Sequence, residues 1–163
     1  MSARSNSQAE PQPPVWIDYD YAVVRVVPSV ARGAFVNVGV VLHARRARFL
    51  EARLHPDVAT WPDLATLPDV LLQGALDAYT AVCAGHGVIG CYPPSERFHW
   101  LTAPRSAALR TSPVHSGRTT DPATTLAALY KAVVLGGIEQ TSTARSAGST
   151  LGAGLKTAAR SRA

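Results

Sequence analysis

Residues 32–44 have the sequence Arg-Gly-Ala-Phe-Val-Asn-Val-Gly-Val-Val-Leu-His-Ala and form the most apolar run of the chain. The run is rich in valine, lacks helical periodicity, and lies between a glycine and an Arg-Arg pair. A short valine-rich run between turn signals is typical of a buried strand, so we predict a central strand over residues 35–44. Asn37 and Gly39 are two residues apart and are therefore expected on one side of that strand.

Two further strands are predicted beside this central strand. Residues 17–27 alternate with a period of two and are rich in tyrosine and valine. Residues 48–54 follow a short Arg-Arg-Ala turn and end before His55 and Pro56. Both segments contain strand-forming side chains, so we expect an antiparallel sheet built around the central strand.

The register of this sheet is predicted from the apolar pattern. Pairing Val26 with Val36 and Leu42 with Leu50 gathers hydrocarbon side chains on one face, whereas a slip of one residue mixes charged side chains into both pairings. The opposite face then carries the polar side chains Arg25, Asn37, Arg53 and His55, together with Gly39, Val41 and His43. Within this set, Arg25, Asn37 and His55 are expected in one row across the sheet.

Two helices are predicted from periodicity and end signals. Residues 66–84 place apolar side chains at helical spacing, and Gly85 is a typical end signal. A second helix begins at Asp121 as N-cap, has Pro122 at its first helical position, and ends before a pair of glycines. The apolar stripe of this helix consists of Leu126, Leu129, Tyr130, Val133 and Val134.

The segment between the two helices is less regular. The alternation of Phe98, Trp100 and Thr102 predicts a strand over residues 97–103, and residues 107–111 are expected to form another short strand. Residues 112–120 are polar and rich in serine and threonine, which predicts a loop. Together the elements indicate an α+β fold whose antiparallel sheet has three to five strands, with the two main helices packed on one face.

The two ends of the chain differ from this domain in composition. Residues 1–16 are rich in serine, glutamine and proline, and residues 138–163 are rich in alanine, serine, glycine and threonine. Such segments cannot bury enough apolar surface to fold. We therefore predict a disordered N-terminal tail, a single domain over residues 17–137, and a disordered basic C-terminal tail.

The excess positive charge lies mostly in the C-terminal tail. Residues 17–139 hold eleven Arg and Lys against ten Asp and Glu, whereas residues 140–163 hold four basic residues and no acidic one. A basic tail can contact nucleic acid or an acidic partner, although it is more often a solvated end. Nucleic-acid binding is therefore a third hypothesis for the function, and it depends on this tail alone.

Two cysteines, Cys83 and Cys91, flank His86 in the pattern C-x2-H-x4-C. A structural zinc site needs a fuller set of ligands, so we expect two buried thiols and no metal or cofactor. The first residues lack the charged start and apolar core of a signal peptide, and no run is long enough to span a membrane. These features predict a cytoplasmic protein of bacterial type.

Five motifs follow one another along the predicted domain. They are Tyr-Asp-Tyr-Ala-Val-Val-Arg-Val-Val-Pro at 19–28, Arg-Gly-x-Phe-Val-Asn-Val-Gly-Val-Val-Leu at 32–42, Glu-Arg-Phe-His-Trp-Leu at 96–101, Ala-Pro-Arg-Ser at 103–106 and Thr-Ser-Pro-Val-His-Ser-Gly at 111–117. In this order they resemble a family of small bacterial proteins catalogued as domain of unknown function 3037. The resemblance implies no established activity. It implies a kinase similar to the HipA toxin family as a partner, because such kinases are encoded beside family members.

The first candidate site is the polar face of the sheet. An arginine on an apolar strand face needs a partner or an anion, so Arg25 and Asn37 could hold a carboxylate or a phosphate. Arg53 and His55 complete this set. The alternative is structural, with Arg25 paired to Glu51 and Asn37 bonded to a neighbouring backbone group.

The second candidate site precedes the helix that begins at Asp121. Hydroxyl side chains and arginines near a helix N-terminus suit an anion, whose charge meets free backbone N–H groups. The members of this set are Arg105, Thr111, Ser112, His115, Ser116 and Arg118. The alternative is a polar surface turn in which the hydroxyls bond to the backbone, and Asp121 as N-cap already occupies part of the helix end.

The sequence contains no H-E-x-x-H motif, nucleophile elbow or phosphate loop. We therefore predict a non-catalytic binding or accessory module that engages an anionic group or a partner protein. The residues assigned to binding are Arg25, Arg32, Asn37, Arg53, His55, Arg105, Thr111, Ser112 and His115. The alternative is an enzyme that acts on phosphate esters or nucleic acid, with His115 or His55 as general acid or base and arginines as charge stabilisers.

Overall fold

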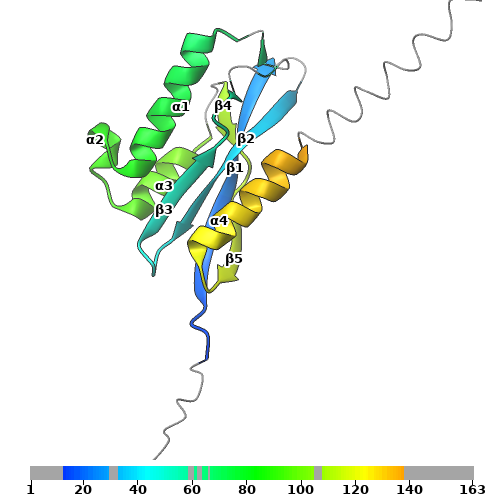
Figure 1. Cartoon of the computed structure of the whole chain (residues 1–163). Coiled ribbons are helices and arrows are strands. Elements are labelled where there is room, and N and C mark those ends of the chain that lie inside the picture. Colours follow the sequence, from blue (N-terminus) through cyan, green and yellow to red (C-terminus); the bar gives the residue numbers. More distant parts are fainter. Residues whose placement is uncertain are drawn as a thin grey trace, which may run out of the picture.

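The computed structural model describes residues 13–29, 33–58, 61, 64–65, 67–104 and 108–137 (Figure 1). The strands in these ranges are β1 (Ile17–Ser29), β2 (Ala34–Ala44), β3 (Phe49–Leu54), β4 (Leu109–Thr111) and β5 (His115–Thr119). The helices are α1 (Asp69–Ala84), the short α2 (Gly87–Gly90), α3 (Pro94–Thr102) and α4 (Pro122–Tyr130), which continues into the π-helical segment η4 (Lys131–Leu135). The predicted α+β class and antiparallel sheet are confirmed. Except for residues 13–16, both predicted tails lie outside the described residues.

Strand β1 is the centre of the sheet. One edge of β1 pairs with β2, whereas the other edge pairs with β5 in its first half and with β4 in its second half. Between β4 and β5, the Ser112 hydroxyl accepts a hydrogen bond from the Val23 N–H at 2.9 Å, and the Ser112 N–H donates to the Val23 carbonyl at 2.8 Å. Ser112 therefore continues the hydrogen bonding of β1 where β4 ends.

A β-bulge in β2 interrupts the register predicted for β1 and β2. Arg25 pairs with Asn37 as predicted, but Val24 pairs with Gly39, so Val38 is an extra residue on the β2 side. A bulge of this kind changes which side chains share a face, because faces alternate with every residue of a strand.

Beyond the bulge, the predicted faces of β2 are wrong. Gly39, Val41 and His43 lie on the face opposite to Arg25 and Asn37. The register between β2 and β3 also differs by one residue from the prediction, since Leu42 pairs with Glu51 and not with Leu50. The apolar pattern did not exclude this pairing because both faces of β2 are apolar beyond the bulge.

Helices cover both faces of the sheet. On the side that we call the α1 face, apolar side chains of α1 and α3 pack on Ala22, Val24, Val26, Val38 and Val41. On the side that we call the α4 face, Leu126, Tyr130 and Val134 of α4 and η4 pack on Val40, Leu42 and Ala44. Figure 1 shows α4 and the α1–α3 pair on different sides of the strands. The prediction that both main helices pack on one face is therefore wrong.

The two predicted helices have the end signals expected from the sequence. Gly85 ends α1 in the left-handed conformation at φ 89°. Asp121 caps α4, because its carboxylate accepts hydrogen bonds from the backbone N–H groups of Ala123 at 3.0 Å and Thr124 at 3.3 Å. These interactions lower the pKa of Asp121, with the bond from the Thr124 hydroxyl as the largest contribution.

Two local predictions are wrong. Residues 97–103 were predicted as a strand but belong largely to α3, where Pro94 opens the helix and the buried Phe98 and Leu101 are spaced by three. Residues 115–119 were predicted as loop but form β5, because β1 supplies backbone partners to a segment that has no apolar pattern of its own.

The cysteine prediction holds for one residue only. Cys83 is buried, whereas Cys91 is exposed. Burial raises the pKa of the Cys83 thiol to about 11. Among the described residues, no helix is long and apolar enough to cross a membrane.

Candidate functional site

Arg25 and Asn37 lie side by side on the α4 face. Arg25 Nε donates to Asn37 Oδ1 at 3.3 Å, and Asn37 Nδ2 donates to the Val133 carbonyl oxygen of η4 at 3.2 Å. The Arg25 guanidinium also lies over the Phe35 ring, with 4.2 Å between Cζ and the ring centroid. The arginine is therefore held by an amide that is itself fixed to the backbone, and the described residues show no ion pair between Arg25 and Glu51.

Arg110 lies beside Arg25 on the other edge of β1, because β4 pairs these two residues. Paired residues on neighbouring strands project from the same face. Arg110, Arg25 and Asn37 therefore form one row across β4, β1 and β2, which we call the arginine row. Two guanidinium groups on one face of a sheet can both donate to a single carboxylate or phosphate.

Arg53 and His55 belong to the same face but lie outside the arginine row. The Arg53 guanidinium lies 5.1 Å from the ring centroid of Tyr130, measured from Cζ. His55 Nδ1 accepts a hydrogen bond from the Asp57 N–H at 3.2 Å, and the His55 ring packs edge-on against Trp61 at 4.8 Å. The predicted row of Arg25, Asn37 and His55 is not formed. The backbone N–H of His55 donates to the carbonyl of Val38, the bulge residue, and so His55 does not lie opposite Asn37.

In the second predicted set, the hydroxyl groups of Thr111 and Ser112 bond to the backbone, whereas that of Ser116 bonds to the Asp20 side chain. Ser112 is buried against Val23, and Thr111 Oγ1 donates to the Thr102 carbonyl at 3.4 Å. His115 is exposed, and its ring packs against Tyr21 at an angle of 31°, with 5.2 Å between centroids. Arg32 and Arg105 lie outside the described residues.

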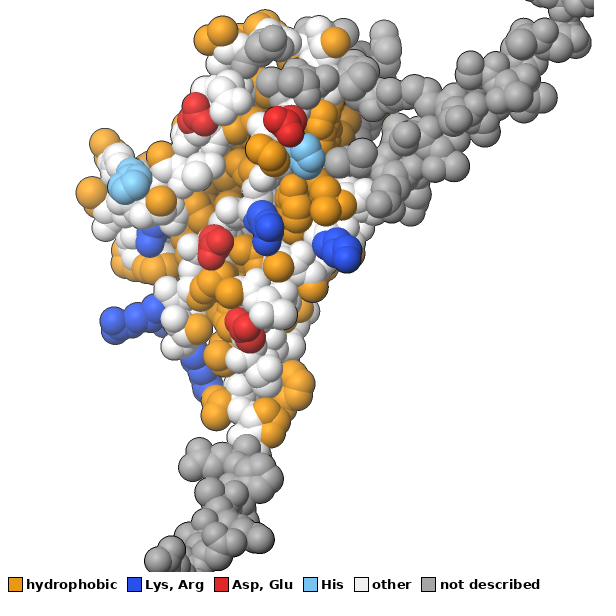
Figure 2. Space-filling view, in the orientation of Figure 1, with side chains coloured by type: hydrophobic (Ala, Val, Ile, Leu, Met, Phe, Trp, Pro, Cys, Tyr) orange, Lys and Arg blue, Asp and Glu red, His pale blue; other side chains and the backbone are white. Residues whose placement is uncertain are grey.

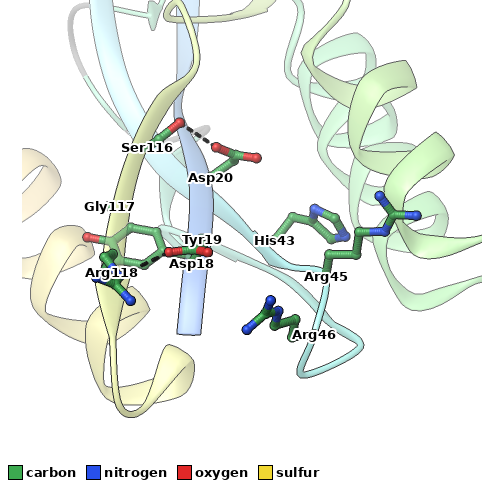
Figure 3. A pocket seen from close by; sticks show the side chains of 9 residues that line it. All are labelled: Asp18, Tyr19, Asp20, His43, Arg45, Arg46, Ser116, Gly117 and Arg118. Atoms are coloured by element: carbon green, nitrogen blue, oxygen red, sulfur yellow. Dashed lines mark hydrogen bonds and ion pairs between the residues drawn. The ribbon is translucent and has the colours of Figure 1, made fainter. Parts of the chain in front are cut away.

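A pocket lies at the opposite end of the sheet, on the α1 face (Figure 3). Its volume is ≈ 520 Å³, and it is lined by Asp18, Tyr19, Asp20, His43, Arg45, Arg46, Ser116, Gly117 and Arg118. The strand register brings Ser116, Asp20 and His43 into one row across β5, β1 and β2. Ser116 Oγ donates to Asp20 Oδ1 at 2.5 Å, and Arg118 Nε lies 3.1 Å from Asp18 Oδ1.

His43 is the most deeply buried polar side chain of this pocket, with 6% of its surface exposed. Its Nε2 lies 3.2 Å from Ser95 Oγ, and its ring stacks on Phe98 with 5.3 Å between centroids. Burial lowers the pKa of His43; the nearby Asp20 carboxylate acts in the opposite direction, and His99 and Arg45 add to the lowering. The neutral imidazole is therefore favoured near neutral pH.

The sequence analysis did not assign Asp18, Asp20, His43, Arg45 or Arg46 to a site. The sequence contains a partial signal of this pocket, because Asp18 and Asp20 alternate with Tyr19 and Tyr21. The alternation places both carboxylates on one side of the first half of β1. The contribution of β5 could not be predicted, since that segment was expected to be a loop.

The structure thus defines a small α+β domain with two separate groups of polar side chains and no recognisable catalytic set among the described residues. The chain belongs to the family described as protein of unknown function (DUF3037), whose sequence profile matches residues 21–134. The matched region contains the whole arginine row, whereas Asp18 and Asp20 of the pocket precede it. No curated protein and no solved structure matches the chain.

Proposed function

We propose that this protein is a non-catalytic binding module that engages an anionic group of a partner protein through the arginine row. The main support is the orientation of Arg25, which Asn37 and Phe35 hold beside Arg110. A guanidinium that is already oriented loses little conformational freedom on binding. It offers parallel N–H donors whose geometry matches a carboxylate or a phosphate.

The neighbourhood of the arginine row favours a protein as the partner. Phe35 is 50% exposed although it is a large aromatic side chain. Arginine and aromatic side chains are enriched at the energetically important centres of protein interfaces. A carboxylate on the partner would meet Arg25, while an apolar neighbour of that carboxylate would cover Phe35.

On the side of the molecule shown in Figure 2, the distribution of charge does not favour nucleic acid as the ligand. Figure 2 shows charged side chains placed singly among apolar ones on this side of the molecule, without a continuous basic surface. Nucleic acids are bound mainly by several cations that neutralise successive phosphates. The nucleic-acid hypothesis therefore depends on the basic tail, which lies outside the described residues.

The histidines assigned to the enzyme hypothesis have positions that do not favour catalysis. His55 Nδ1 accepts a hydrogen bond from the Asp57 N–H, and the His55 ring packs against Trp61. His115 is exposed and packs against Tyr21. A general base must reach the proton that it removes from a bound substrate. Neither histidine lines the pocket, so binding is the function that the geometry supports better.

Titration of the isotope-labelled full chain with hexaglutamate, followed by backbone amide shifts, tests the anion-binding step. We expect saturable shifts at Phe35, Asn37 and Arg110. Arg25→Ala should weaken the affinity roughly tenfold or more, since a hydrogen bond to a charged group contributes about 1.5–3 kcal/mol. Arg48→Asn is the matched control, because Arg48 is an exposed arginine in the turn between β2 and β3.

The purified kinase similar to HipA, which the family resemblance implies as a partner, is the protein to test in the same assay. Binding that is lost in Arg25→Ala and retained in Arg48→Asn would support the proposal. Equal affinities of both variants for hexaglutamate and for the kinase would contradict it. Turnover in a phosphodiesterase, phosphatase and nuclease screen, abolished by His115→Ala, would replace it with the enzyme hypothesis.

A further inference from the structure

We propose a second binding site, in the pocket on the α1 face, for a small molecule that carries a phosphate or a carboxylate group. This site is independent of the arginine row, because it lies on the other face of the sheet and at the other end. Its anion-binding wall is the turn that follows β2, and its floor is His43. Three observations support the assignment: the balance of charge, the state of His43, and the size of the space.

The charges that line the pocket leave an excess of positive charge. Three arginines stand against two aspartates. Asp18 is already paired with Arg118, and Asp20 already accepts a hydrogen bond from Ser116. Among the described residues, neither the Arg45 side chain nor the Arg46 side chain forms an ion pair or a hydrogen bond. Figure 3 shows Arg46 extending from its turn across the hollow toward the side on which Arg118 lies.

His43 supplies a buried polar nitrogen to the same space. Its Nε2 is engaged by Ser95, and no hydrogen-bond partner of its Nδ1 occurs among the described residues. When the Ser95 hydroxyl donates to Nε2, the proton of the neutral ring is on Nδ1 and can be donated to a ligand oxygen. A ligand oxygen would therefore find a neutral N–H donor beside the arginines of the turn.

The size of the pocket indicates a molecule larger than a single ion. Its ≈ 520 Å³ falls within the range of about 300–1,000 Å³ that is typical of small-molecule sites. Tyr19 and Gly117 also line this space, although the Tyr19 ring itself packs with the cluster on the α4 face.

The proposal is tested by titrating the isotope-labelled full chain with inorganic phosphate and, separately, with acetate, at constant ionic strength. We expect saturable shifts of the His43 ring nitrogens and of the amides of Arg46 and Ser116. A response to phosphate alone would assign a phosphorylated ligand, and a response to acetate alone would assign a carboxylate. Arg46→Ala should weaken the affinity roughly tenfold or more through loss of a charged donor.

Arg48→Asn serves as the control for general charge. Arg48 belongs to the same turn, is exposed and lies outside the pocket lining, and asparagine tolerates its positive φ of 51°. Binding retained in Arg48→Asn and weakened in Arg46→Ala would support the site. Absence of a saturable response to either anion, or equal weakening by both substitutions in folded variants, would overturn it.

Discussion

The α4 face and the α1 face of the sheet share strands β1 and β2 but carry their polar side chains at opposite ends. On the α4 face, Arg25 and Asn37 lie where η4 crosses the sheet, and Asn37 is bonded to the helix backbone. On the α1 face, Asp18 and Asp20 lie where the sheet borders a pocket, and their partners are surface side chains of β5. Asn37 beneath η4 thus becomes part of the scaffold and orients Arg25, whereas the polar side chains next to the pocket have exposed partners.

The largest expected effect concerns the α4 face, whose core is smaller. Leu42 is fully buried beneath α4 and η4. Leu42→Ala should lower the free energy of unfolding by about 2–5 kcal/mol, because it removes buried methyl groups and leaves a cavity. Urea denaturation measures this loss, and Leu72→Ala on α1 provides the matching value for the α1 face. A loss below about 1 kcal/mol would show that α4 packs only loosely on the sheet.

Asn37→Ala tests whether the polar groups beneath η4 belong to the scaffold. The substitution removes the hydrogen bonds to the Val133 carbonyl and to Arg25, so we expect a loss of about 1–3 kcal/mol in urea denaturation. Hydrogen exchange in η4 should become faster. Ser116→Ala removes one exposed hydrogen bond at the pocket, and its smaller expected loss makes it the control. Equal losses would remove the distinction between the two ends.

His43 should make the α1 face sensitive to pH. Burial lowers its pKa in the folded protein below the ordinary 6.5, against the effect of Asp20 and with that of His99 and Arg45. The unfolded chain then binds the proton of this histidine more readily than the folded protein does. The contribution of His43 to the free energy of unfolding is therefore fully present above pH 6.5 and is lost as the pH drops from 6.5 toward the folded pKa. The urea concentration at the midpoint of unfolding should decrease as the pH is lowered from about 7.5 to about 5.5, and it should decrease less in His43→Gln. Identical profiles would contradict this role.

The smallest effect is expected at the ion pair of Asp18 and Arg118. The two side chains are 73% and 66% exposed, so solvent screens their attraction. Arg118→Ala should change the free energy of unfolding by about 0–1 kcal/mol, and added salt should reduce even that difference. A larger cost, unaffected by salt, would indicate that the rim of the pocket contributes to the fold as the α4 face does.

The elements that sequence reasoning predicted are those with local determinants. The valine-rich run of β2, the glycine at the end of α1 and the Asp121 cap each depend on residues within one segment. The β-bulge in β2 depends on contacts with the neighbouring strands, and Gly39 was the only sign of it in the sequence of β2. A Cβ at Gly39 would collide with the Leu54 side chain and lie 2.6 Å from the Arg53 carbonyl oxygen, so the close approach of β3 excludes a side chain there.

The candidate sites follow the same division. Arg25 and Asn37 were predicted as neighbours because they lie on the side of the bulge where the predicted register of β1 and β2 holds. The pocket was not predicted, because Ser116 and Arg118 reach it only through the pairing of β5 with β1. The α3 segment was misassigned since its apolar residues fit both an alternating strand and a helix with Phe98 and Leu101 on one side.

The position of β1 also affects how the chain acquires its structure during synthesis. One edge of β1 is completed early, by β2, but the other edge waits for β4 and β5, and the Val23 to Ser112 hydrogen bond spans 89 residues. Such distant contacts slow folding and prolong the exposure of unpaired strand groups. On the ribosome, the nascent protein therefore carries an open β edge until β4 and β5 have been translated, and chaperones or a partner chain can bind there during that period.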